Sequence, residues 1–380
     1  MKKIYFIAGE MSGDFIGGHV IQNLKSNEGL EFTGIGGKYM EEAGNFKSLF
    51  TITAINLIGF IEIIPHLLKI KKLIDKTVEH IINSKADLLI TIDSPGFTYR
   101  VAKRVRKLLP NLKMIHIVAP SVWAYKADRA VNYAKIYDCL FALLPFEPPY
   151  FTKVGLDCRY IGHPIMEQEF YRDKIALRKE LKIDENERIL CVTLGTRKGE
   201  ILRHLPIFID AIQEISKDYK NLTIIFPLAH PDHEAIIKPF LDNIQFNYLF
   251  LSNERLKAYA VSDLALAKSG TNTLEISASG TPMVVAYKVN IISFIIIMLL
   301  IKIKYVSLIN IIAGSEIIPE FIQFNCKANL ISNKLKELLS NSQKRYNQVV
   351  KSKKILQKLG FESNRSPSYI AAKIIKQEFL

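Results

Sequence analysis

An aspartate and an arginine each follow an apolar run of strand length, a common position for side chains that do chemistry. Asp93 comes directly after Leu88–Ile92, and Arg197 comes shortly after Ile189–Leu194. Open α/β sheets bind ligands at the carboxyl ends of their strands, so both residues are candidates for an active site. The carboxylate of Asp93 can act as a general base on a hydroxyl group, and the guanidinium of Arg197 suits a pyrophosphate. The alternatives are a helix N-cap for Asp93 and a surface ion pair with Glu200 for Arg197.

Two glycine-containing turns supply further candidates. Residues 8–14 have the sequence AGEMSGD, and residues 268–275 have the sequence KSGTNTLE. Glycine lets a ligand approach the backbone, and the N-terminus of the following helix favours phosphate. The carboxylate of Glu275 can accept hydrogen bonds from ribose hydroxyls. The candidate ligand-binding residues of these turns are Glu10, Ser12, Gly13, Ser269, Gly270, Thr271 and Glu275.

Several cofactor classes lack their sequence signatures. Neither residues 8–18 nor the cluster Gly34–Gly37 form a dinucleotide-binding fingerprint, and the sequence has no GxxxxGK[ST] loop, which disfavours NAD and ATP. The four cysteines lie far apart without a CxxC pair, and no histidine spacing typical of a metal site occurs. We therefore expect no cofactor, no metal and a reducing compartment. His116 lies inside an apolar run and is predicted to be a core histidine.

The charge balance and two apolar segments indicate an anionic partner. The chain has 51 Lys and Arg against 37 Asp and Glu, a formal net charge of +14. Such a charge attracts nucleic acids, anionic lipids or phosphorylated substrates, or reflects composition alone, and no nucleic-acid-binding motif accompanies it. The apolar run Ile291–Ile301 precedes Lys302 and is shorter than the roughly 20 residues that span a bilayer. It is predicted to be a buried core helix or a membrane-interface helix, and residues 61–72 are a second candidate for membrane contact.

A parallel α/β architecture would place all these candidates at strand ends. Short apolar runs alternate with longer segments of helical spacing, which is typical of parallel sheets covered on both faces. This rhythm restarts after residues 161–164, and the polar segment Arg172–Lys182 precedes the next run, so we expect a domain boundary near residues 164–186. The predicted strands are Ile4–Ala8, Leu88–Ile92, Met114–Val118, Cys139–Leu144, Ile189–Leu194, Leu222–Phe226, Tyr248–Leu251, Leu264–Ala267 and Met283–Tyr287. We expect two doubly wound, Rossmann-like domains with a ligand-binding cleft between them.

The single tryptophan, Trp123, lies in the segment Pro120–Tyr125, close to Lys126 and Arg129. An aromatic pair beside cations can pack against a sugar ring or line an acyl groove. Ordinary packing of a loop is an equally good interpretation.

Nine short motifs, taken in order, resemble the lipid-A-disaccharide synthase family. They run from residue 8 to residue 323 and cover most of the chain. Each motif is weak alone, but the nine in one order are specific to that family. The motifs are AGE-x-SGD, GIGG, ID-x-P, PSVWA, LLPFE, IGHP, G-x-R-x-x-E, SGT-x-TLE and N-x-x-AG followed by PEF-x-Q.

The resemblance implies a GT-B glycosyltransferase without a metal requirement. The expected donor is UDP-2,3-diacylglucosamine, the acceptor is 2,3-diacylglucosamine 1-phosphate, and the products are the β(1→6)-linked disaccharide 1-phosphate and UDP. It also implies that Asp93 and Arg197 are catalytic, and that Asn310, Glu320 and Gln323 bind substrate. The expected domains are 1–165, which faces the acceptor and the membrane, 166–345, which binds the UDP-sugar, and 346–380, whose helices cross back onto the first domain.

The same resemblance predicts a cytoplasmic protein on the inner face of the inner membrane, with a homodimer as one option. An α-linked UDP donor that gives a β-product requires inversion at the anomeric carbon. Two other functions are compatible with the sequence. One is another UDP-sugar enzyme of the same fold, such as a UDP-sugar epimerase or a soluble transferase. The other is a non-catalytic protein that binds lipid surfaces.

Overall fold

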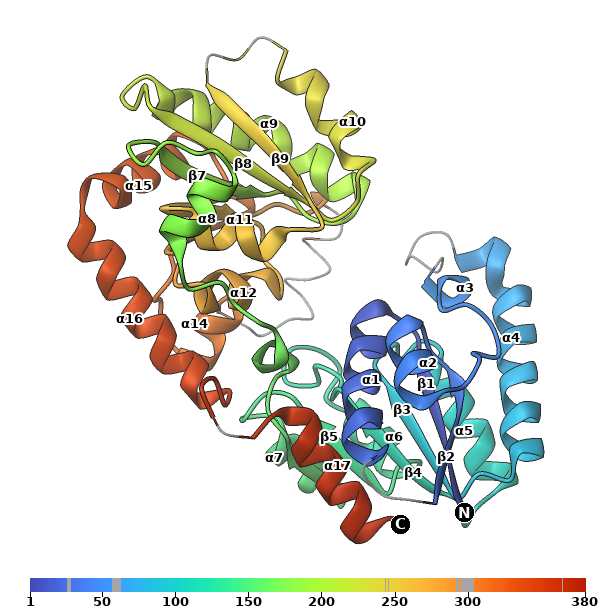
Figure 1. Cartoon of the computed structure of the whole chain (residues 1–380). Coiled ribbons are helices and arrows are strands. Elements are labelled where there is room, and N and C mark those ends of the chain that lie inside the picture. Colours follow the sequence, from blue (N-terminus) through green and yellow to red (C-terminus); the bar gives the residue numbers. More distant parts are fainter. Residues whose placement is uncertain are drawn as a thin grey trace. The chain divides into compact units, whose positions relative to one another are not determined.

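The structure is a computed structural model that describes residues 1–25, 29–56, 63–242, 244, 246–291, 294, 304–363 and 365–380. It consists of two compact units (Figure 1). The first unit contains Met1–Glu167 together with Leu359–Leu380, and the second contains Gln168–Lys358. Each unit is an α/β fold around its own parallel sheet, as expected for two Rossmann-like domains.

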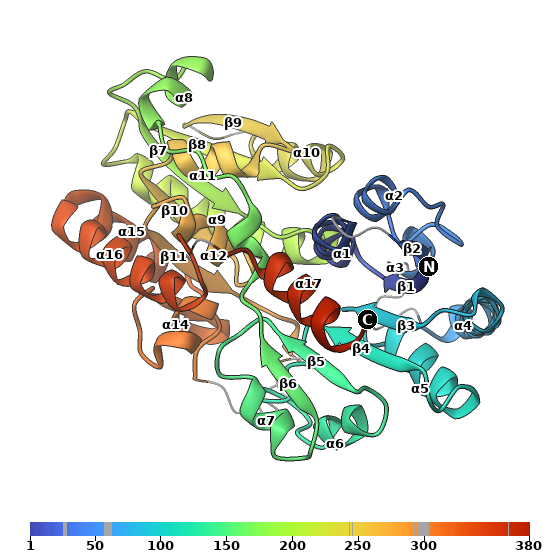
Figure 2. The same cartoon turned by 60° about the horizontal axis from the view of Figure 1, so that its bottom comes forward.

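The sheet of the first unit has the strand order β2-β1-β3-β4-β5-β6, with every neighbouring pair parallel (Figure 2). Side chains of β1 alternate between two apolar clusters, because the sheet is covered on both faces. Tyr5 and Ile7 belong to one cluster, and Ile4, Phe6 and Ala8 to the other. The strands are β1 (Lys2–Ala8), β2 (Leu30–Ile35), β3 (Leu88–Ile92), β4 (Lys113–Ile117), β5 (Cys139–Ala142) and β6 (Asp157–Tyr160).

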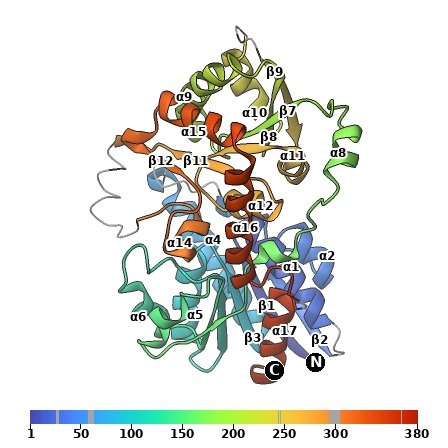
Figure 3. The ribbon, with the colours of Figure 1, turned by 90° about the vertical axis from the view of Figure 1, so that its left-hand side faces the viewer.

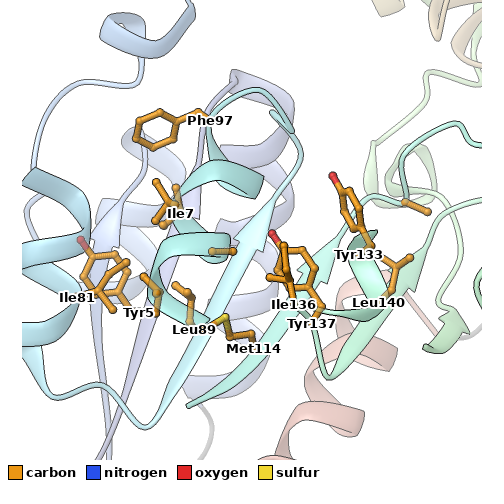
Figure 4. Packing of buried hydrophobic residues seen from close by; sticks show 14 of the residues in the cluster. Tyr5, Ile7, Ile81, Leu89, Phe97, Met114, Tyr133, Ile136, Tyr137 and Leu140 are labelled. Carbon is orange, nitrogen blue, oxygen red and sulfur yellow. The ribbon is translucent and has the colours of Figure 1, made fainter. Parts of the chain in front are cut away.

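Helices bury one apolar face each against this sheet. Helix α4 (Ile63–Ser84) contributes Ile70, Ile74, Val78 and Ile81, a spacing that puts them on one side of a helix. Figure 4 shows Ile81 packed beside Tyr5 and Leu89. The other helices of this part are α1 (Met11–Lys25), α2 (Lys38–Gly44), α3 (Thr53–Asn56), α5 (Thr98–Leu108), α6 (Arg129–Ala134), α7 (Pro148–Thr152) and η1 (Pro164–Glu167).

The last helix, α17 (Pro367–Glu378), packs against α1 within the first unit (Figure 3). Its Ala372 and Ile375 share an apolar cluster with Val20 of α1. The side-chain amide of Asn23 also donates a hydrogen bond to the hydroxyl of Ser368 at 3.0 Å. Residues far apart in the sequence therefore complete one core.

The second unit has the strand order β12-β11-β10-β7-β8-β9, also parallel throughout. Leu190 and Val192 of β7 pack against Leu205 and Phe208 of α9. The strands are β7 (Arg188–Thr193), β8 (Leu222–Leu228), β9 (Asn247–Ser252), β10 (Leu264–Ala267), β11 (Met283–Tyr287) and β12 (Glu320–Ile322). The helices are α8 (Lys174–Glu180), α9 (Lys198–Ser216), α10 (His233–Ile237), η2 (Lys238–Phe240), α11 (Arg255–Val261), α12 (Asn272–Ala278), α14 (Leu308–Ala313), η3 (Gln323–Asn325), α15 (Ala328–Ser340) and α16 (Ser342–Lys358).

All nine predicted strands are present, with shifts of a few residues at their ends. Strands β2, β6 and β12 were not among the predicted strands, because each lies at a sheet edge and contains at least one charged residue, which interrupts the continuous apolar signal. The expected boundary between residues 345 and 346 is wrong, since it falls inside the single helix α16. The chain returns to the first unit at Leu359 instead.

The two predicted membrane segments are described only in part. Residues 292–293 and 295–301 of the apolar run, and residues 61–62 of the other segment, lie outside the described residues. Within the part of the chain that the structure describes, no helix has the length and apolarity needed to cross a membrane.

Candidate active site

Each sheet has a topological switch point, and the predicted site residues follow the strands on its two sides. In the first unit, the chain passes from β1 outward to β2 and then returns to build β3 to β6 on the other side of β1. In the second unit, the corresponding reversal lies between β7 and β10. Ligands of open α/β sheets bind outside the carboxyl ends of the strands at such points. Asp93 and Arg197 therefore stand where this architecture forms its sites.

Asp93 lies in a tight turn directly after β3. Its φ of 51° and the φ of 47° at Ser94 are both in the left-handed region, which a non-glycine residue rarely adopts. Oδ1 of Asp93 accepts a hydrogen bond from the backbone N–H of Ser94 at 2.7 Å, and the hydroxyl of Ser12 also bonds to the carboxylate. Helix α5 has Phe97 at its N-cap and no side-chain cap, so the N-cap interpretation of Asp93 is wrong.

Two motifs meet at this turn. A Cβ atom on Gly9 would lie 2.3 Å from Oγ of Ser94, so only glycine allows the turn after β1 to pack against the turn after β3. Burial raises the pKa of Asp93, while the hydrogen bonds from Ser94 and Ser12 act in the opposite direction. A partly desolvated carboxylate that is held in place and has a raised pKa is suited to accept a proton from a hydroxyl group.

Asp14, the last residue of the AGE-x-SGD motif, anchors the GIGG motif. Its side chain is 3% exposed and accepts backbone hydrogen bonds from Gly37 at 2.7 Å, Tyr39 at 3.1 Å and Met40 at 3.0 Å. These N–H groups belong to the first turn of α2, which has no cap from its own N-cap residue, Gly37. Asp14 therefore caps α2 from another element. At the start of α1, Ser12 is exposed and Gly13 is buried. Glu10, just before the helix, is exposed.

The core of the sheet beneath this turn contains three hydrogen-bonded polar side chains. Nδ1 of His116 lies 2.7 Å from the hydroxyl of Thr91, which also bonds to the hydroxyl of Tyr137 at 3.1 Å. Burial lowers the pKa of His116 to about 3, so the ring is neutral at physiological pH. The prediction of a core histidine is confirmed.

Trp123 and Glu147 connect the PSVWA and LLPFE motifs. The indole Nε1 of Trp123 donates to Oε1 of Glu147 at 3.2 Å, and Oε2 accepts from the backbone N–H groups of Leu143 and Leu144. Burial raises the pKa of Glu147 to about 7. Trp123 also packs edge-on against Phe146, with ring centroids 5.3 Å apart. The structure thus supports the packing interpretation of Trp123 and shows its partner.

In the second unit, Arg197 is the exposed N-cap residue of α9. The predicted alternative, an ion pair with Glu200, is not what the structure shows. Oε1 of Glu200 lies 3.3 Å from Nζ of Lys268, which comes from the loop after β10. This pair joins the first turn of α9 to the loop after β10 at the switch point. Arg197 stays exposed at the N-terminus of a helix, where a phosphate group would be stabilised.

The loops after β7 and β10 have glycines where the backbone requires them. Gly195 has φ +118° and Gly270 has φ +158°, conformations that side chains disfavour. The hydroxyl of Thr193 accepts from the side-chain amide of Asn272 at 2.9 Å, and the hydroxyl of Ser269 donates to the carbonyl of Val306 at 2.9 Å.

Two residues at the start of α12 were also predicted to bind substrate. Thr271 is the exposed N-cap of α12. The carboxylate of Glu275 lies in an ion pair with Arg255, at 3.0 Å from Nε to Oε2 and 2.9 Å from Nη2 to Oε1. A ribose at Glu275 would therefore share the carboxylate with Arg255.

Asn310, Glu320 and Gln323 form internal clamps. The carboxylate of Glu320 accepts from the backbone and hydroxyl of Ser307 and from the amide of Asn310, which also donates to the carbonyl of Ile318. Oδ1 of Asn310 accepts from the backbone N–H groups of Ile317 and Ile318. These bonds attach α14 to β12. Asn310 and Glu320 therefore position these two elements. Their direct contact with substrate stays a prediction.

Gln323 clamps the segment after β11. Its side-chain amide accepts from the backbone N–H of Val289 at 3.1 Å and donates to the carbonyl of the same residue at 3.2 Å. The side chain is buried, so its contact with substrate also stays a prediction.

Sequence reasoning did not single out Lys268 or His204, which contact Glu200 and the carbonyl of Leu194, respectively, close to Arg197. Lys268 carries a signal, since it follows a buried strand, but His204 lies within an ordinary amphipathic helix and has none. Among the described residues, no three His, Cys, Asp or Glu side chains gather in a way that would hold a metal ion.

Curated relatives cover the chain from end to end. A sequence model of the family described as "Lipid-A-disaccharide synthetase" matches residues 4–374. The lipid-A-disaccharide synthase of Rickettsia typhi is 92% identical over 380 residues, covering all of both chains. That of Rickettsia felis is 80% identical, over all of this chain and 97% of the relative.

Solved structures share the fold. The UDP co-structure of S. aureus MnaA has a TM-score of 0.65 at 12% identity and covers 99% of this chain and 95% of its own. The UDP-GlcNAc 2-epimerase of Neisseria meningitidis, bound to UDP-GlcNAc, has a TM-score of 0.63 at 14% identity, with coverage of 99% and 98%. At these identities the likeness extends to the fold alone. The family match and the full-length identities show that this chain belongs to the lipid-A-disaccharide synthase family.

Proposed function

We propose that the chain transfers a diacylglucosamine unit from UDP-2,3-diacylglucosamine to 2,3-diacylglucosamine 1-phosphate, with release of UDP. The chain belongs to the lipid-A-disaccharide synthase family, whose name describes this reaction. The observation that carries the proposal is the position of Asp93, a half-buried carboxylate at the switch point of the first sheet. The product is the β(1→6)-linked disaccharide 1-phosphate.

Asp93 acts as the general base. It takes the proton from the 6-hydroxyl of the acceptor as that oxygen attacks the anomeric carbon of the donor, from the face opposite UDP. The bond from the anomeric carbon to the diphosphate breaks in the same step, and the configuration inverts. The strained turn at Asp93 and Ser94 keeps the carboxylate in one orientation during this transfer.

The second unit stabilises the departing UDP. Negative charge grows on the diphosphate as the glycosidic bond breaks, and Arg197 together with the N-termini of α9 and α12 supplies positive potential. Lys268 adds a cation in the loop between them, held by Glu200. Ser269 and Thr271 provide hydroxyl groups at the start of the second helix.

An anionic membrane surface is the proposed location of both acylated substrates. The described part of α4 exposes Leu68, Lys69, Lys71 and Lys72, while Ile70 is buried in the core. Exposed lysines beside an apolar side chain suit lipid headgroups. The proposed location is the inner face of the inner membrane, as the family resemblance implies.

The direct test is incubation of the purified chain with the UDP-diacylglucosamine donor and the monosaccharide phosphate acceptor. Formation of the disaccharide and UDP in equal amounts is expected, and a donor incubated alone should stay unchanged. The fold of UDP-GlcNAc 2-epimerase is shared, so the second arm matters. Conversion of the donor without acceptor would identify an epimerase, and binding of lipid without conversion would identify a non-catalytic protein.

A further inference from the structure

His204 lies on α9 and is completely buried, at 0% exposure. Its two ring nitrogens contact backbone groups that follow two different strands. Nδ1 lies 3.2 Å from the carbonyl oxygen of Leu194, the residue before Gly195. Nε2 lies 3.0 Å from the backbone N–H of Lys288, the residue after β11.

These two partners determine the state of the ring. A carbonyl oxygen can only accept, so Nδ1 carries a proton and donates to Leu194. A backbone N–H can only donate, so Nε2 is unprotonated and accepts from Lys288. The imidazole is therefore neutral, with one defined tautomer. Burial lowers the pKa of His204, which agrees with this assignment.

Through Tyr287, the imidazole of His204 is also linked to Lys268 in the loop after β10. The imidazole stacks on Tyr287, with centroids 5.4 Å apart and an interplanar angle of 28°. On the same phenol ring, Nζ of Lys268 lies 5.8 Å from the centroid. Strands β7, β10 and β11 are neighbours, so the loops that follow them lie side by side. His204 connects the loop before Arg197, the loop of Lys268 and the loop after β11.

We propose that His204 is a positioning residue that sets the spacing of these three loops for the diphosphate of the nucleotide-sugar donor. This inference rests on the proposed function, because it takes this sheet edge to be the donor site. It adds to that function that His204, a residue without direct ligand contact, contributes to the affinity for the donor. Loops held at a fixed spacing keep Arg197 and Lys268 in place before the ligand arrives, and preorganised charges bind without reorganisation.

The test compares His204→Phe with His204→Gln. Phenylalanine keeps the stacking on Tyr287 and loses both hydrogen bonds, whereas glutamine can donate to Leu194 and accept from Lys288 through one amide. Because His204→Phe loses both bonds, it should bind UDP about tenfold more weakly, measured by calorimetry. Its KM for the donor should rise by a similar factor. The KM for the acceptor should stay within about twofold. His204→Gln should recover most of the UDP affinity.

Gln348, on α16, provides a matched control because its side chain bonds to the backbone of the same strand, β11. Its buried side chain accepts from the backbone N–H of Met283 at 2.6 Å and donates to the carbonyl of Met283 at 3.0 Å, at the opposite end of β11. Gln348→Leu therefore removes two comparable buried bonds far from the loops. It should lower Tm as much as His204→Phe does and leave UDP affinity unchanged. Equal losses of UDP affinity in both variants would reduce His204 to a stabilising role and overturn the proposal.

A second variant keeps the proposal testable if His204→Phe does not fold. Tyr287→Leu removes the ring on which both His204 and Lys268 lie, and weaker UDP binding is expected. Unchanged binding in this variant would contradict the coupling of the loops. A wild-type protein that fails to bind UDP would overturn the proposed function itself. A wild-type protein that binds UDP, with a His204→Phe variant that binds equally well, would overturn only the inference.

Discussion

The indole of Trp123 donates a hydrogen bond to the carboxylate of Glu147 at 3.2 Å, so a loop with an aromatic side chain is held by a buried acid. The same carboxylate accepts from two backbone N–H groups in the turn before α7. One side chain thus determines how two segments of the first unit meet, and its charge is costly at this depth.

Glu147 should make stability fall as pH rises. Burial raises the pKa of Glu147 from 4.5 to about 7, so the folded protein keeps a proton that the unfolded chain releases. The stabilising contribution is complete below pH 4.5 and is lost as pH rises to about 7, at most about 3 kcal/mol. Glu147→Gln cannot titrate, so urea unfolding between pH 5 and 8 should show a flatter pH dependence. The exposed Glu42→Gln should keep the wild-type slope, and an unchanged slope in Glu147→Gln would contradict the assignment.

Asp93→Asn should lower turnover by about 10²–10⁴ and leave UDP binding intact, because an amide cannot accept the proton of the acceptor hydroxyl. Steady-state kinetics and calorimetry with UDP measure the two effects. Asp87→Asn is a matched control, since Asp87 is an exposed carboxylate at the other end of β3 that accepts from the backbone of Lys3. Near-normal turnover in Asp93→Asn would remove Asp93 from the chemistry.

Arg197→Ala should weaken UDP binding and slow turnover, because a cation at the N-terminus of α9 is lost beside the diphosphate. Arg197→Lys should recover only part of the affinity, since an ammonium cannot bind two phosphate oxygens through a planar fork. The exposed Lys217→Ala, at the other end of the same helix, serves as control. If the UDP affinity of Arg197→Ala equals that of wild type, the phosphates bind elsewhere.

Asp14→Ala should destabilise the protein by about 2–4 kcal/mol, because three backbone N–H groups of the α2 N-terminus lose their acceptor. Asp14→Asn keeps one acceptor oxygen and should lose less. Chemical denaturation of both variants provides the measurement. A loss below about 0.5 kcal/mol in Asp14→Ala would show that water satisfies these groups.

Binding to anionic vesicles should weaken with salt, because screening shortens from roughly 10 Å at 0.1 M to 3 Å at 1 M. Exchange of Lys69 and Lys72 for glutamate should reduce binding at low salt, measured by vesicle sedimentation. The same exchange at Lys351 and Lys353, exposed on α16, is the control. Equal losses from both pairs would mean that net charge, and not α4, directs the attachment.

Local patterns along the chain were enough to predict the architecture and the positions of the two main candidates. Continuous apolar strands such as Leu88–Ile92 can be recognised from the sequence because both faces of a parallel sheet are buried. Asp93 follows this strand directly. Arg197 was recognised in the same way, from a strand, a glycine and a helix start. The family resemblance rested on motif order and needed no coordinates.

The contacts of most motif residues, in contrast, became visible only in the folded chain. Asp14 caps a helix that begins 24 residues later, Glu147 meets Trp123, and His204 joins loops after two strands. Spacing along the chain records which residues share a strand or a helix face, because those periods are local. Hydrogen bonds between segments depend on how sheets and helices fold against each other, and no local period encodes them. Asn310, Glu320 and Gln323 were predicted to bind substrate from the family resemblance, and that contact stays a prediction. The structure adds that their side chains hold the backbone of the second unit.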